Sequence, residues 1–120
     1  MTQLFIMLAG VFGAVGVGFA AGAAHGGDAG ALGPASNMLL FHAPALLALG
    51  LYGRTLAALP RSLAAGGAFI ALGAALFAAA LAGRYYFGMP PFPMAAPTGG
   101  TLMMAGWAIV LAGGLLLGRR

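Results

Sequence analysis

The chain contains no cysteine, no lysine and no glutamate, and charged residues make up only 5% of its 120 positions. The lack of cysteine excludes disulfides and thiolate metal sites. Soluble domains carry charge on roughly a quarter of their residues, so this composition does not suit a water-exposed surface. The single acid, Asp28, lies outside every apolar segment. Small antiporters that exchange protons for cations need a buried carboxylate, so the sequence disfavours that class.

Hydrolytic and nucleic-acid-binding patterns are missing as well. Ser36 and Ser62 are the only serines, and the predicted topology places Ser62 on the side opposite both histidines, which argues against a Ser/His/Asp hydrolase. The doublet Gly99-Gly100 has no following lysine and so is not a phosphate loop. The arginines are scattered rather than gathered into a basic face, which argues against nucleic acid as a partner. We therefore expect a protein that is not an enzyme and holds no cofactor.

Hydrophobic residues make up 62% of the chain. A membrane-spanning helix needs ~20 mainly apolar residues, and four segments meet that requirement. The sequence predicts an all-α, polytopic membrane protein: one domain over residues 1–120, built as an antiparallel bundle of four transmembrane helices. The first segment carries no basic residue before its apolar run, so we interpret it as a retained helix rather than a signal peptide. The predicted spans are residues 2–24, 37–58, 60–83 and 101–118.

Two features define the expected start of the second span. Ser36 or Asn37 suits the N-cap position. Pro44 removes one backbone hydrogen bond inside the span, which predicts a kink or a late helix start near His42. Residues 84–100, rich in proline and aromatics, are expected to be irregular.

Small residues recur every four positions along the first span and so share one helical face. Phenylalanines spaced by seven residues fall on a roughly opposite face. Small side chains let another helix backbone approach closely, so we expect the small face to pack and the phenylalanines to meet lipid. Glycines near the end of the fourth span offer a further surface for a partner. The small face comprises Gly10, Ala14, Gly18 and Gly22, the phenylalanines are Phe5, Phe12 and Phe19, and the last glycines are Gly114 and Gly118.

The arginines predict the orientation. Four spans place both termini on one side of the bilayer, together with four of the five arginines, whereas Arg84 lies alone on the other side. Because positive residues concentrate on the cytoplasmic side, we expect a protein of the bacterial inner membrane with both termini in the cytoplasm. The four arginines are Arg54, Arg61, Arg119 and Arg120.

Three short motifs resemble a known family. Residues 97–107 read PTGGTLMMAGW, residues 19–25 read FAAGAAH, and residues 41–43 read FHA. Taken in chain order, these segments resemble the YgdD-like family of small membrane proteins, whose pattern is a GAFGAH segment, an aromatic-His-Ala motif, and a TP-x-GG turn followed by a helix with GW. The resemblance implies a four-helix membrane fold and lends no established chemistry. The motif positions are His25, His42, Pro97, Gly99, Gly100, Gly106 and Trp107.

The chain also departs from that family. Its loop between the two histidines is shorter, Pro44 replaces an ordinary helix former, and residues 77–80 (FAAA) replace a serine-containing run. Part of the polar set that a shared function would use is therefore missing here.

The histidines carry the remaining chemical hypothesis. His25 and His42 are expected on the non-cytoplasmic side at similar depth, together with Met38, Met103 and Met104. Imidazole and thioether ligands suit Cu(I). The competing interpretation is local: His25 caps the first helix, His42 bonds a carbonyl freed by Pro44, and the methionines fill apolar space.

We favour the local interpretation and expect no metal. The expected function is that of a non-catalytic accessory or packing subunit. Its partners would be the lipid bilayer and either other membrane subunits or further copies of itself. A Cu(I)-handling protein using His25, His42 and Met38, and a small oligomeric channel or carrier, are the alternatives.

Overall fold

The chain folds into long α-helices joined by short connections. The computed structural model describes residues 1–26, 30 and 32–118, and over this part of the chain it contains four helices and no strand. Each helix is long and apolar enough to cross a membrane. The all-α prediction is therefore confirmed. The helices are α1 (Thr2–His25), α2 (Leu32–Arg54), α3 (Arg61–Phe87) and α4 (Ala95–Leu117).

Helix α2 begins five residues earlier than predicted. Leu32 is its first residue, so Ser36 lies in the second turn and the prediction of an N-cap at Ser36 or Asn37 is wrong. Pro34 falls in the first turn, where the missing N–H is tolerated. The helix continues through Pro44 to Arg54, so Pro44 does not delay its start.

The segment between α3 and α4 is shorter than the predicted irregular stretch. Helix α3 continues to Phe87, and Gly88 ends it with a left-handed backbone (φ 74°) whose N–H bonds the carbonyl of Arg84 at 3.1 Å. Such an ending favours glycine. Helix α4 begins at Ala95, directly after Met94 in the same left-handed region. Only residues 88–94 connect the two helices, and Arg84 lies within α3.

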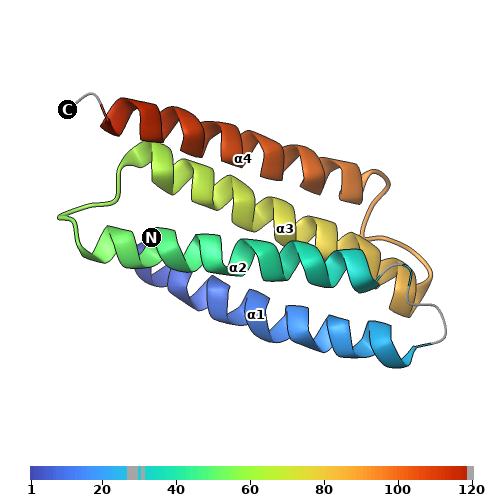
Figure 1. Cartoon of the computed structure of the whole chain (residues 1–120). Coiled ribbons are helices and arrows are strands. Elements are labelled where there is room, and N and C mark those ends of the chain that lie inside the picture. The colour runs from blue at the N-terminus through green and yellow to red at the C-terminus, as the bar shows by residue number, and fades with distance from the viewer. Residues whose placement is uncertain (27–29, 31, 119–120) are drawn as a thin grey trace.

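The helices lie side by side in chain order, each antiparallel to the next (Figure 1). Helices α1 and α4 occupy opposite edges, and the backbone measures 53 × 25 × 18 Å. The antiparallel order agrees with the prediction, but the arrangement is an open array rather than a closed bundle. The N-terminus, the α2–α3 connection and the end of α4 all lie at one end of the molecule.

The face assignment of α1 is wrong. Phe5 and Phe12 are buried, 1% and 5% exposed, and Phe19 packs against the same core. The rings fill space that small residues on neighbouring helices leave open: a Cβ added to Gly67 of α3 would lie 2.7 Å from Cζ of Phe5. The aromatic side of α1 therefore faces the protein.

The small side of α1 faces outward. Gly10, Ala14 and Gly18 are exposed, and a Cβ added at either glycine meets no other atom of the described chain within 4 Å. Only Gly22 has a neighbour, Leu32, at 3.1 Å from the added Cβ. An added Cβ at Gly114 likewise meets no described atom within 4 Å.

Glycines do mediate close contact between α3 and α4. They recur every seven residues on both helices, which keeps them on one face. A Cβ at Gly73 would lie 2.6 Å from the carbonyl oxygen of Gly99, and one at Gly106 would lie 2.8 Å from the carbonyl oxygen of Gly66. The two backbones touch, which is the close approach that small residues permit between neighbouring helices.

Candidate functional site

A histidine and a tryptophan meet in the middle of the helices. The indole N–H of Trp107 on α4 donates to Nε2 of His42 on α2 at 3.2 Å, and Nδ1 of His42 lies 2.6 Å from the carbonyl oxygen of Met38. Because Nε2 accepts, the proton must sit on Nδ1, which donates to that carbonyl. The hydrogen bonds thus assign a neutral imidazole whose two nitrogens are both engaged.

The pair lies far from both helix ends. His42 is ten residues into α2 and Trp107 is twelve residues into α4, which corresponds to about 15 and 18 Å along the helix axes. His42 is 8% exposed, and the two rings lie 6.1 Å apart between centroids with a 46° tilt. Trp107 is 45% exposed, so its ring also lines the outside of the array.

A second polar contact joins α2 to α1. The hydroxyl of Ser36, which is 2% exposed, donates to the carbonyl oxygen of Gly16 at 2.7 Å. Glycine favours this approach, because a Cβ on Gly16 would lie 2.8 Å from the side chain of Leu40, which would then have to move. Helix α2 therefore holds α1 through Ser36 and α4 through His42, two hydrogen bonds in an apolar interior.

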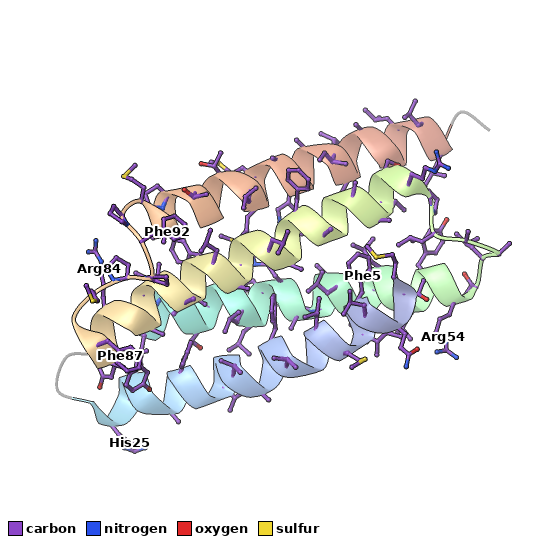
Figure 2. All side chains as sticks on the ribbon, turned by 180° about the vertical axis from the view of Figure 1, so that it is seen from behind. Phe5, His25, Arg54, Arg84, Phe87 and Phe92 are labelled. Atoms are coloured by element: carbon purple, nitrogen blue, oxygen red, sulfur yellow. The ribbon has the colours of Figure 1, made fainter. Side chains whose placement is uncertain are left out.

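The residues predicted for a metal site do not converge. His25 is exposed in the last turn of α1 (Figure 2), whereas His42 lies about 15 Å deeper along α2. The prediction that the two histidines share a depth is wrong. Met38 is joined to His42 through its carbonyl oxygen. Among the described residues, no group of three or more histidine, cysteine or acidic side chains could hold a metal.

The local interpretation of His42 also needs correction. Proline 44 frees the carbonyl four residues before it, that of Leu40. His42 instead bonds the carbonyl of Met38, one turn before its own position. The imidazole is therefore satisfied by its own helix and by Trp107, independently of the proline.

Arg84 lies at the opposite end of the molecule from Arg54 (Figure 2), in the last turn of α3. The adjacent Tyr85 and Tyr86 rings pack edge to face at 4.9 Å between centroids. The sequence allows an ion pair between Arg84 and Asp28, and this pair lies outside the described residues, because Asp28 is not among them.

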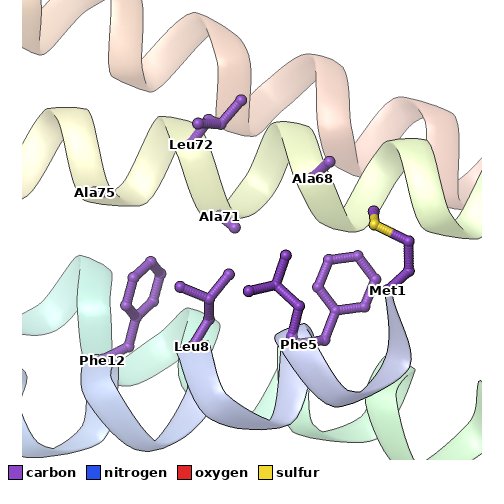
Figure 3. A pocket seen from close by; sticks show the side chains of 9 residues that line it. Met1, Phe5, Leu8, Phe12, Ala68, Ala71, Leu72 and Ala75 are labelled. Carbon is purple, nitrogen blue, oxygen red and sulfur yellow. The ribbon is translucent and has the colours of Figure 1, made fainter.

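An apolar groove runs between α1 and α3. Figure 3 shows side chains of α1 directed toward a row of small residues on α3. The first part has a volume of about 290 Å³, and a second part of about 240 Å³ continues it toward Phe19. Phe12 and Ala75 line both parts, so the two form one groove; we call it the α1–α3 groove. Its first part is lined by Met1, Leu4, Phe5, Leu8, Phe12, Ala68, Ala71, Leu72 and Ala75.

The family-motif positions take different places. Gly99 and Gly106 face α3 at backbone contact, and Trp107 bonds His42, another motif residue. Pro97 lies in the first turn of α4, and a Cβ added at Gly100 meets no described atom within 4 Å. No protein-family model, curated protein or solved structure matches the chain. The resemblance to the YgdD-like family stays a prediction.

Sequence reasoning missed both interhelical hydrogen bonds. A signal existed for one of them: Trp107 brings an N–H donor into the middle of an apolar helix, and such a donor normally finds an acceptor. His42 was the only histidine inside a predicted span, which made it the natural candidate. Ser36 offered a similar signal once its helix was known to start at Leu32.

Proposed function

We propose that the chain is an integral membrane protein with both termini in the cytoplasm. Its four apolar helices support the membrane placement. Arg54 and Arg61 flank the α2–α3 connection, at the end of the molecule where α1 begins and α4 ends, and Arg84 lies at the other end. This distribution supports the orientation through the preference of arginine for the cytoplasmic side.

Reporter fusions test this orientation. A fusion after Met94, in the α3–α4 connection, should report the non-cytoplasmic side, and one after Arg120 should report the cytoplasm. The same side for both positions would contradict the four-span arrangement.

Within that membrane, we propose a non-catalytic accessory role in which α1 packs against a helix of another subunit or of a second copy. One observation carries this proposal: the face of α1 with Gly10, Ala14 and Gly18 is small, exposed and unused by the described chain. Elsewhere in the molecule, glycines such as Gly73 and Gly106 are covered by a neighbouring backbone.

The physical reason is specific to lipid. Lipid tails are as apolar as leucine, so burial of apolar surface drives no helix association there; close packing and hydrogen bonds do. A small-residue face permits that close packing, and an open array leaves it accessible at the edge. The hydrogen bonds inside the chain already join α1, α2 and α4, so α1 is held in place while its outer face stays available.

The two alternatives have less support. For a copper site, His42 would first have to give up Trp107 or the Met38 carbonyl. For a channel or carrier, a polar path is needed, and the buried side-chain polar atoms of the described chain are all hydrogen-bonded within it.

Crosslinking from α1 tests the accessory role. The chain has no cysteine, so Ala14→Cys introduces a single reactive position on the small face. In intact cells, we expect it to give a defined crosslinked product, either a dimer or a complex with another subunit. Ala65→Cys, on the exposed side of α3, is the matched control.

The expected product should be lost when Gly18→Leu is added, because the leucine blocks close approach. The accessory proposal is overturned if Ala14→Cys gives no more product than Ala65→Cys, or if Gly18→Leu leaves the product unchanged.

A further inference from the structure

We propose that the α1–α3 groove holds one acyl chain of an anionic phospholipid, with the lipid headgroup at the end of the molecule that carries Arg54 and Arg61. The proposal rests on the membrane placement and orientation proposed above. It does not depend on any partner of α1, because the groove lies on the aromatic side of that helix, away from Gly10 and Gly18.

The lining selects an apolar, flexible occupant. The first part of the groove is bounded by leucine and phenylalanine side chains of α1 and by alanines of α3 (Figure 3), and it exposes no polar atom. On the α3 side the groove is lined by small side chains, those of Ala68, Ala71 and Ala75, which leave space for an occupant. Nothing along this stretch could orient a polar ligand, whereas a hydrocarbon chain needs only such a surface.

The length matches one leaflet. From Met1 to Phe12 the groove follows eleven residues of α1, which is about 16 Å at the helical rise. Half of a ~30 Å hydrocarbon core is about 15 Å. An acyl chain entering at the Met1 end would therefore lie along the first part of the groove and end near Phe12, where the second part begins.

The charges at that end favour an anionic headgroup. Arg61 is the first residue of α3, at the same end of the molecule as the Met1 entrance of the groove; it lines a separate cavity between the α2–α3 connection and the end of α4. Arg54 ends α2 close to the start of α1, because a Cβ on the preceding Gly53 would meet Thr2. Both arginines are exposed, and the chain has a single acid, Asp28, which lies between α1 and α2 in the sequence rather than beside either arginine.

The experiment measures lipid retained by the whole protein. The chain is reconstituted in vesicles of equal parts phosphatidylglycerol and phosphatidylcholine, extracted in mild detergent, and examined by native mass spectrometry. We expect phosphatidylglycerol to be retained on the order of one molecule per chain, in preference to phosphatidylcholine. Each arginine should contribute about five-fold to that preference.

Four variants locate the site. Ala68→Phe fills the groove near its entrance and should abolish retention, whereas Ala108→Phe, on an exposed side of α4 outside the groove, should not. Arg61→Gln should reduce the preference for phosphatidylglycerol, whereas Arg84→Gln, at the opposite end, should leave it unchanged. If Ala68→Phe does not fold, as judged by circular dichroism, Ala75→Phe at the inner end of the groove takes its place.

Several results would overturn the proposal. Equal retention of the two lipids, undiminished retention in the groove-filled variant, or loss of the preference in Arg84→Gln would each do so. A dimer without bound lipid that disappears in Ala68→Phe would show instead that a second copy fills the groove. A reversed topology in the fusion experiment would contradict the proposed orientation alone, because lipid retention is measured independently of which side of the membrane each end faces.

Discussion

The contact between α3 and α4 can be tested with a single methyl group. A Cβ at Gly73 would lie 2.6 Å from the carbonyl oxygen of Gly99 and 2.7 Å from the backbone nitrogen of Met103. Neither backbone atom can move without its helix, so Gly73→Ala forces α3 and α4 apart. Overpacking of this kind costs about 1–3 kcal/mol.

Gly18→Ala is the matched control. Both glycines lie inside helices, so both substitutions gain the same helix propensity, about 0.5–1 kcal/mol. At Gly18 the added methyl meets no described atom within 4 Å. The propensity term cancels in the comparison, and the difference between the two variants isolates the packing cost of about 1–3 kcal/mol. This corresponds to about 5- to 150-fold in the unfolding equilibrium constant.

The assay is reversible unfolding of the purified chain in mixed micelles with increasing SDS, followed by far-UV circular dichroism and by the fluorescence of Trp107, the only tryptophan. We expect Gly18→Ala to be as stable as the unmodified chain or slightly more so, and Gly73→Ala to be clearly less stable than Gly18→Ala. If both variants shift the midpoint equally, the backbone contact between α3 and α4 does not hold the fold together.

Four further predictions concern the interior hydrogen bonds, the core and the metal hypothesis. Trp107→Phe and His42→Leu should each destabilise the chain, and a double-mutant cycle between them should show a coupling of about 0.5–2 kcal/mol; additive effects would contradict the hydrogen bond. Ser36→Ala should cost about 1 kcal/mol in the same SDS titration, whereas a neutral result would mean that the Gly16 carbonyl finds another donor. Phe12→Ala should destabilise the chain more than Leu4→Ala, because Phe12 is 5% exposed and Leu4 is 47% exposed. A buried Phe→Ala substitution usually costs ~3–5 kcal/mol of unfolding free energy, as the sum of a transfer term and a cavity term. Where lipid replaces water the transfer term disappears, so only the cavity term applies. Elemental analysis of protein purified without chelator should find no stoichiometric copper, and one copper per chain that is lost in His42→Ala would revive the metal hypothesis.

Composition alone predicted the class of the fold. The chain has four apolar stretches of sufficient length, little charge, and prolines near the predicted helix ends. These features favour helices of membrane length, because backbone groups in lipid must bond within their own helix. The helix boundaries were less accurate. The prediction left two terminal turns outside the helices, residues 32–36 and 84–87, and both are helical. Polar residues, or a proline in the first turn, are compatible with helical backbone at the end of a helix.

The faces of α1 could not be read from the sequence, because both of its sides are apolar. In water, the polar side of a helix reveals its exposed face; in this chain the choice lay between glycines and phenylalanines, either of which can pack. The residues of the neighbouring helix α3 decide which side of α1 faces the protein. Gly67 on α3 leaves space for the ring of Phe5, so the aromatic side turned inward and Gly18 was left outside.

The sequence by itself determined the number of helices, their antiparallel order and the concentration of arginine at one end, since these follow from apolar length and from the parity of four spans. Only the tertiary structure decided which residues meet. The bond between His42 and Trp107 joins positions 65 residues apart, and no periodicity within either helix specifies that pairing. The α1–α3 groove likewise exists only because α1 and α4 lie at opposite edges of an open array, with the aromatic side of α1 turned toward the small residues of α3.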